Sequence, residues 1–576
     1  MDACMKQRAR RRATAATTVA FIFALLALFS TTAAAQENPA RTDERYNISY
    51  QLSMPNPASH LFEVTMTVEP QQVVEAVDFQ MPRWSPGRYA VFDFAKNVQE
   101  VRATTACPPN ALCDAMTLPV TRLDTQTWRV YPGKSRGVAF SYKVFANDLS
   151  GTFSQLDARH ANFNGGSIFM YVVGHKPDPV RLLINAPNGW RILNAATARP
   201  DQSEWQFPNY DILIDTPTEI APDFTVDEFK VDGKTYRVMV HSLGEEKGRR
   251  AELVARIERL VRSETAMMGT PDYDSYTFLM HFDPTSPRGD GMEHLASTQI
   301  ITTRALGDKD VLEDAVDTAS HEFFHVWNVK RLRPVELGPW DFTRPLNTRS
   351  LWIAEGLTNY YGHLMQRRAS LWSDAQIERE LGQAIGIVEN APGSRLMSAE
   401  EASLIAPFID RGQSAQQTNL RETSISYYNK GEVVGIVLDL LIRGRTHGRA
   451  SLDDVMRRMY EEFYLRSPQT TYYLRGRGYT GADFERAASQ VAGADLSDFF
   501  ARHVAGVEPM PYDEALAYVG LKLVKTPAPA STATTTPPRS SATPQTPPRT
   551  RYDFRLEEIK DAPAEARALR AAWLKG

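Results

Sequence analysis

The sequence predicts a multidomain α+β protein, and three changes of pattern along its 576 residues support this fold class. From about residue 44 to 225, apolar and polar residues alternate between Pro, Gly and Asn breaks, as in "LFEVTMTVEP" and "GVAFSYKVFA". Near residue 243 the apolar period becomes helical, and the chain stays mainly helical from about residue 311 to 505. Residues 526–550 are rich in Pro, Thr and Ser and cannot bury a core. These changes predict a β-sandwich, a mixed region and a helical domain, followed by a linker.

These patterns divide the chain into five predicted parts. They are a signal peptide (1–35), an N-terminal β-sandwich (36–230), a domain of strands and helices (231–370), a helical domain (371–515), and a Pro/Thr-rich linker with a short C-terminal tail (516–576).

The first 35 residues have the organisation of an export signal. Five basic residues lie between Lys6 and Arg12, an apolar run spans residues 19–29, and Ala33 and Ala35 form a small-x-small cleavage site. The apolar run is too short to cross a bilayer comfortably. We therefore expect a periplasmic or secreted protein, and the alternative is an uncleaved segment that serves as a membrane anchor.

Composition and charge narrow the class of partner. The chain is 43% hydrophobic and 23% charged, which is typical of globular protein. Removing residues 1–35 takes away five basic residues and one acidic residue, so the net charge changes from −4 to −8. An acidic body without a basic stripe argues against nucleic acid as a partner. Cys107 and Cys113 lie close together, and an oxidising compartment favours a disulfide between them.

The motif "HEFFH" at residues 321–325 predicts a metal site on a helix that we expect to span about residues 311–331. Positions four residues apart lie on one face of an α-helix, so His321 and His325 point together. Glu322 is rotated to the side, where it can reach a metal-bound water. The apolar neighbours of this motif indicate a buried helix, in which polar groups need partners.

A zinc hydrolase needs three protein ligands and one open position, so a third ligand is expected nearby. Glu355 lies in the next helical segment, predicted for residues 350–368, and would complete a set of two histidines and one glutamate. Spacing alone also leaves His363, Asp341 and Glu336 as candidates.

Several stretches together resemble one known family. "HEFFHVWNVKRLRP", followed by "LWIAEGLTNYYG", closely resembles the glycyl aminopeptidase family of metallopeptidases (metallopeptidase family sixty-one). "PRGDGMEHLAST", "YYNKGEVVGIVLDLLIR" and "MPRWSPGRYAVFDFAKNVQ" are also similar to that family. The resemblance covers about residues 45–520 and implies a thermolysin-like (gluzincin) catalytic domain between the β-sandwich and the helical domain.

The resemblance implies a role for each matching residue. His321, His325 and Glu355 would bind one zinc ion, and Glu322 would be the general base. Glu293 would hold the α-amino group of the substrate. Tyr428 would stabilise the oxyanion, although spacing alone leaves Tyr427 equally possible. His294, next to Glu293, is expected to line the pocket, and Asn328 is expected to support the metal ligands.

The resemblance also implies the reaction. We expect an aminopeptidase acting on peptides with a free N-terminus, with a preference for a small first residue such as Gly or Ala. Two alternatives stay open: a zinc endopeptidase or relaxed-specificity peptidase, and a non-catalytic surface binding protein with a vestigial zinc site. Many members of the family carry a PDZ domain after the helical region, but here about 25 residues follow the Pro/Thr-rich stretch, too few for that fold.

Overall fold

The computed structural model describes residues 44–107, 114–410, 420, 422–528 and 550–576. The predicted signal peptide and most of the Pro/Thr-rich stretch lie outside these ranges. Cys107 is disulfide-bonded, whereas its predicted partner, Cys113, lies outside the described residues. Among the helices that the structure describes, none has the length and apolar character needed to cross a membrane.

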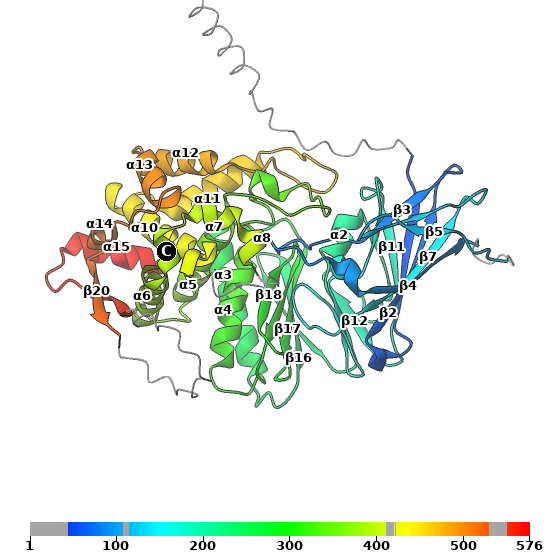
Figure 1. Ribbon diagram of the computed structural model, residues 1–576. Coiled ribbons are helices and arrows are strands. Elements are labelled where there is room, and N and C mark those ends of the chain that lie inside the picture. The colour runs from blue at the N-terminus through cyan, green and yellow to red at the C-terminus, as the bar shows by residue number, and fades with distance from the viewer. Residues whose placement is uncertain (1–43, 108–113, 411–419, 421, 529–549) are drawn as a thin grey trace, which may run out of the picture. The chain divides into compact units, whose positions relative to one another are not determined.

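The N-terminal region is a β-sandwich, as predicted (Figure 1). Alternate side chains of its strands are buried because one face of each sheet lies on the core. Phe79 of one sheet stacks on Phe140 of the other with ring centroids 4.0 Å apart, so the two inner faces meet. The larger sheet has the order β13 (Glu204–Phe207), β11 (Val180–Asn185), β1 (Asn47–Ser53), β2 (Leu61–Glu69), β7 (Val138–Phe145) and β4 (Val98–Thr105). The smaller sheet has the order β10 (Tyr171–Val172), β3 (Val77–Gln80), β6 (Thr127–Val130) and β5 (Val120–Arg122).

A third sheet lies between the sandwich and the next domain. Leu193 and Ala221 of this sheet share a small buried cluster with Met239 and Leu279 of the following sheet, so the two sheets are in contact. Its order is β12 (Arg191–Asn194), β14 (Thr218–Ala221), β9 (Ala161–Phe163) and β8 (Gln155–Leu156).

The mixed domain is built on a five-stranded sheet covered by two helices, α3 (Arg250–Met268) and α4 (Val311–Phe324). The helical period predicted from residue 243 onward corresponds to α3. Strand β18 pairs only with β19 among the described residues, in antiparallel register, and therefore forms an edge of the sheet. The order is β15 (Thr225–Val231), β16 (Lys234–Ser242), β17 (Ser275–Phe282), β19 (Ser297–Thr302) and β18 (Asp290–Glu293).

Two predicted helices differ from the observed ones. The helix expected over residues 311–331 ends at Phe324, because the chain turns and Val329 has a φ of 124°, which a helix cannot contain. The segment expected over residues 350–368 begins with one π-helical turn, η5 (Trp352–Gly356), before α5 (Leu357–Arg368). Both irregularities fall at the predicted metal ligands.

A bundle of helices packs against the mixed domain and shares one continuous hydrophobic core with it. Helix α10 (Tyr427–Arg445) is buried along nearly its whole length and lies at the centre of the bundle, in contact with η5, α5, α6 (Asp374–Asn390) and α14 (Tyr512–Tyr518). Other helices in this part of the described chain are α7 (Ala399–Leu404), α8 (Ala406–Ile409), α11 (Leu452–Tyr460), α12 (Gly481–Ala492) and α13 (Ser497–Phe499).

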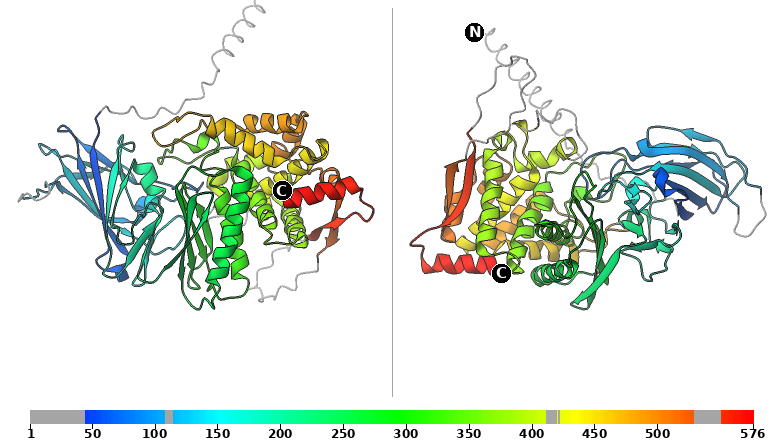
Figure 2. Two further views of the ribbon diagram at one scale, coloured as in Figure 1. Left: turned by 180° about the vertical axis from the view of Figure 1, so that it is seen from behind. Right: turned by 90° about the horizontal axis from the view of Figure 1, so that it is seen from below.

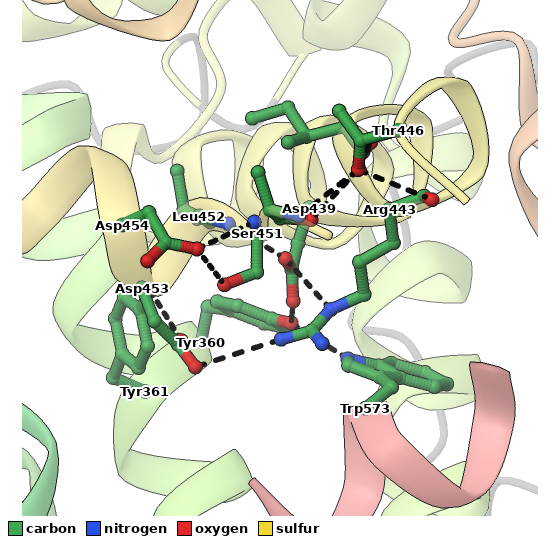
Figure 3. A network of polar contacts seen from close by, with 12 residues as sticks. Tyr360, Tyr361, Asp439, Arg443, Thr446, Ser451, Leu452, Asp453, Asp454 and Trp573 are labelled. Atoms are coloured by element: carbon green, nitrogen blue, oxygen red, sulfur yellow. Dashed lines mark hydrogen bonds and ion pairs between the residues drawn. The ribbon is translucent and has the colours of Figure 1, made fainter. Parts of the chain in front are cut away.

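The C-terminal tail is part of this fold. Strands β20 (Leu521–Pro527) and β21 (Tyr552–Glu558) pair on either side of the Pro/Thr-rich stretch and lie beside α6, while helix α15 (Ala564–Lys575) packs on α5 (Figure 2). Trp573 of α15 is fully buried and donates from its indole N–H to the Tyr360 hydroxyl at 2.8 Å. That hydroxyl donates in turn to Asp439 at 2.6 Å, and Asp439 also accepts a hydrogen bond from Arg443 at 3.0 Å (Figure 3). The tail is thereby tied to the centre of the bundle.

Candidate metal centre

Three predicted ligands converge in the structure. The two Nε2 atoms of His321 and His325 lie 3.1 Å apart, and Glu355 Oε2 lies 3.4 Å from the first and 3.3 Å from the second. In a tetrahedral zinc site with bonds of about 2.0–2.1 Å, neighbouring ligand atoms are about 3.3 Å apart. The three distances therefore match three corners of such a site. Asp341, Glu336 and His363 bind other residues instead: Arg344, Thr348 and Glu432.

The end of α4 orients His325. As the cap residue after Phe324, His325 keeps helical dihedral angles, which leaves it on the same face as His321. Its Nδ1 lies 2.7 Å from the carbonyl oxygen of Asn328. Because a carbonyl only accepts, Nδ1 carries the proton and Nε2 presents a lone pair to the ligand cluster. The Asn328 amide donates to the carbonyl of Ile353 at 2.8 Å. Asn328 thus links both ligand-bearing segments, as expected.

The π-helical turn η5 places Glu355. π-Helical turns are rare and often occur at functional sites. This turn packs directly on α10 through two glycines: a Cβ on Gly356 would lie 2.4 Å from the Gly431 backbone. The Tyr89 hydroxyl donates to Glu355 Oε1 at 2.5 Å, which leaves Oε2 facing the histidines. Tyr89 comes from the "SPGRY" loop of the N-terminal region and had no predicted role.

The electrostatics of the cluster favour a cation. Burial alone would lower the pKa of His325, but the carboxylates that face it, Glu355 first, raise this pKa to about 10. Burial alone would raise the pKa of Glu355, yet His325 and His321 hold it well below the ordinary value. The Glu355 carboxylate, which is 2% exposed, is thus ionised although it is buried, and a cation beside it would compensate its charge.

Glu322 lies beside the ligands with its carboxylate against strand β18. It is 6% exposed, and its Oε2 has no hydrogen-bond partner among the described residues. Burial raises the pKa of Glu322 above the usual range, and His325 offsets part of that rise. A Cβ added to Gly291 would lie 2.1 Å from Glu322 Oε1, so a larger residue at this position would displace the carboxylate.

Glu293 ends the same edge strand and reaches the cluster from the other side. Carboxylate oxygens of Glu293 and Glu322 and a ring nitrogen of His325 all lie within 4.8 Å of one another. Gly87 of the "SPGRY" loop lies directly against Glu293, since a Cβ there would be 2.9 Å from Oε2. Arg88 holds this loop to β18 through a buried 2.6 Å ion pair with Asp290.

Two cavities adjoin these residues. The larger one, about 610 Å³, is lined by His321, Glu322 and Tyr428 among others. The smaller one, about 40 Å³, is lined by Glu293 and by apolar groups that include Trp84 and Trp340. The metal cluster therefore has a wide opening on one side and a small, mostly apolar space beyond Glu293.

The structure separates the two tyrosine candidates. Tyr428 is half-buried, lines the larger cavity, and its ring centroid lies 6.2 Å from that of His321. Tyr427 is buried at 2% exposure and packs against the ring of Tyr89. Tyr428 is therefore the hydroxyl that faces the opening. His294 lies outside the larger cavity; its Nδ1 contacts Asp215 at 3.1 Å.

The chain is similar to known proteins in both sequence and structure. Residues 49–222 match the family model of the Peptidase M61 N-terminal domain, and residues 314–434 match that of the M61 glycyl aminopeptidase. A search of curated proteins finds no match.

Among solved structures, an aminopeptidase N family protein from Idiomarina loihiensis is similar, with 26% identity and a TM-score of 0.74; the match covers 83% of this chain and 79% of that one. The M1 zinc metallopeptidase from Deinococcus radiodurans matches at 12% identity and a TM-score of 0.45, over 81% of this chain and 95% of that one. A variant of the latter, bound to a Tyr-Ser-Ala substrate, matches at 13% identity and a TM-score of 0.44, over 81% and 95%.

Proposed function

Because the chain belongs to the M61 glycyl aminopeptidase family, we propose that it is an exported zinc aminopeptidase that removes a small first residue, Gly or Ala, from peptides. One observation carries this proposal: the Glu293 carboxylate, at the end of an edge strand, lies in one cluster with Glu322 and with the ligand His325. A carboxylate that is fixed beside a hydrolytic centre can bind the free ammonium group of a peptide.

His321, His325 and Glu355 would hold the metal. Two imidazoles and one carboxylate form a common catalytic zinc set, and the three donor distances fit it. When bound, zinc polarises the scissile carbonyl and lowers the pKa of water. Tyr89 fixes which oxygen of Glu355 faces the ion, because its hydroxyl occupies the other one.

Glu322 and Tyr428 would carry the proton transfer and the charge stabilisation. Glu322 lies next to the ligands with an unpartnered oxygen, so it can take the proton of the attacking water and pass it to the leaving amine. Tyr428 presents its hydroxyl at the opening beside His321 and can donate to the oxyanion.

The space around Glu293 favours peptide substrates whose first residue has a small side chain. The cavity of about 40 Å³ next to its carboxylate has space for a methyl group but not for a Leu or Phe side chain. Its lining includes Gly87, the aromatic rings Trp84, Tyr89 and Trp340, and two cationic side chains, Lys330 and Arg333. Strand β18 is an edge strand in the part of the sheet that the structure describes, and an edge strand can pair with an extended peptide backbone. Export rests on the sequence of residues 1–35.

The test compares two substitutions that keep side-chain shape. Glu293→Gln removes the charge that holds the ammonium group and should lower kcat/KM for a glycyl substrate by about 10- to 100-fold, with bound zinc unchanged. Glu322→Gln should abolish turnover with zinc still bound. Glu228→Gln, on exposed strand β15 of the same sheet, is the matched control and should behave like wild type. Unchanged aminopeptidase turnover in Glu293→Gln would contradict the proposed role of this carboxylate.

A further inference from the structure

A second group of buried histidines and a glutamate lies where the third sheet meets the five-stranded sheet. His160, Glu219, His241 and His281 offer ligand atoms that all lie within 4.8 Å of one another. None of the four is more than 5% exposed, and Glu219 is completely buried. The predicted roles in the sequence use none of these residues.

Two neighbouring sheets each contribute two residues to this cluster. His241 of β16 and His281 of β17 are direct neighbours in the parallel register of the five-stranded sheet. Glu219 of β14 pairs with Asn162 of β9 in the third sheet, and His160 immediately precedes β9. The histidines and the glutamate thus meet where the N-terminal region contacts the catalytic sheet.

All three imidazoles direct a nitrogen to the same carboxylate. His241 Nδ1 lies 2.8 Å and His160 Nδ1 lies 3.3 Å from Glu219 Oε1, while His281 Nε2 lies 2.9 Å from Oε2. Ligand atoms around an ion with bonds of about 2.1 Å are about 3.0 Å apart at right angles and about 3.4 Å apart in a tetrahedron. The observed distances are close to that range, and they also suit hydrogen bonds.

The outer nitrogen of His241 also has a carboxylate beside it. His241 Nε2 lies 3.4 Å from Asp223 Oδ1, and such a contact needs a proton on that nitrogen. The inner nitrogen, Nδ1, then faces Glu219 either as a second N–H group or as a metal ligand. A metal on Nδ1 leaves Nε2 protonated and so is compatible with the Asp223 contact.

Burial also favours a metal ion here. Glu219 is completely buried, and both of its carboxylate oxygens face imidazole nitrogens, so a cation at this place would compensate the buried charge.

We propose that His160, His241, His281 and Glu219 bind a second divalent transition-metal ion, of the zinc class, that joins the N-terminal region to the catalytic sheet. Three imidazoles and one carboxylate suit zinc and its neighbours rather than calcium or magnesium. Four protein ligands leave no open position, so the ion is structural and not catalytic. Asn162 donates to Glu219 Oε2 at 3.1 Å and is itself held by Gln299 at 2.6 Å, which fixes the carboxylate in place.

The test is a zinc count on four purified proteins, grown with zinc and dialysed against metal-free buffer. They are the wild type, the double substitution His321→Ala with His325→Ala, the cluster substitution His241→Ala, and the control His175→Ala. His175 is a similarly buried histidine that contacts one carboxylate, Asp178, at 2.9 Å and stacks on Tyr46, so its replacement also removes a buried imidazole and a carboxylate contact.

The proposal predicts two zinc ions per chain in the wild type and in His175→Ala, and one in each of the other two proteins. It also predicts that chelator lowers the Tm of the double substitution, which retains only the cluster ion. One ion in the wild type and none in the double substitution would overturn the proposal, even if His241→Ala fails to fold. One ion in the wild type that persists in the double substitution would support this site and contradict the catalytic one.

Discussion

A substitution at Gly291, on the edge strand, tests the position of the Glu322 carboxylate. In the structure, a Cβ added at this position would lie 2.1 Å from Glu322 Oε1 and 2.9 Å from Thr318 Cγ2. The backbone of Gly291 does not adopt a positive φ, so alanine is permitted there. Gly291→Ala therefore displaces the proposed general base by direct contact, and none of the three proposed metal ligands is among the atoms that the added Cβ would meet.

The size of the effect follows from the geometry. A carbon and an oxygen in ordinary contact are about 3.3 Å apart, so the carboxylate must move by about 1 Å. A displacement of that size costs about 100-fold in rate, or about 2.7 kcal/mol. We therefore expect kcat/KM for a glycyl substrate to fall by about two orders of magnitude, with bound zinc unchanged.

The assay measures steady-state kinetics, zinc content and Tm for Gly291→Ala and for the control Gly481→Ala. An added Cβ at Gly481, the first residue of α12, meets no atom within 4 Å. The control should retain wild-type kinetics. Wild-type kcat/KM in Gly291→Ala would show that the carboxylate of Glu322 is not held where the reaction needs it.

Three further predictions concern the surroundings of the site. Tyr89→Phe removes the hydroxyl that orients the ligand carboxylate of Glu355 and should weaken zinc binding by about 10- to 100-fold, measured by chelator competition; wild-type affinity would contradict that role. Tyr428→Phe should lower kcat by about 100-fold or more. Tyr427→Phe should leave kcat unchanged, because Tyr427 does not line the larger cavity. A larger loss of kcat in Tyr427→Phe than in Tyr428→Phe would assign the oxyanion role to Tyr427 instead. Trp573→Ala should destabilise the fold by about 3–5 kcal/mol, and Trp573→Phe by about 1 kcal/mol. The Tm of thermal unfolding should therefore fall in the order wild type, Trp573→Phe, Trp573→Ala. Equal Tm values in these three proteins would show that the tail is dispensable.

Local pattern in the sequence predicted two of the proposed metal ligands and left several candidates for the third. The four-residue spacing of His321 and His325 determines their common face, and strand alternation predicts the β-sandwich. The next helical segment supplied Glu355 as one of four candidates, and the structure brings it alone to the two histidines.

Contacts between distant segments could not be predicted from local pattern. Tyr89 reaches Glu355 across 266 positions of sequence, and nothing in the "SPGRY" loop indicates that partner. The π-helical turn depends on the close approach of Gly356 to Gly431, which is a tertiary contact. Trp573, near the end of a short tail, gave a weak signal because a single aromatic residue does not show what it packs on.

We propose that this metal centre cleaves peptides only when a free amino group is present. The most direct measurement compares hydrolysis of glycyl p-nitroanilide with that of its N-acetylated form, before and after treatment with chelator and again after zinc is restored. We expect cleavage of the free substrate alone, its loss with chelator and its return with zinc. Equal cleavage of the acetylated substrate, or activity that survives removal of all bound zinc, would contradict the proposed function.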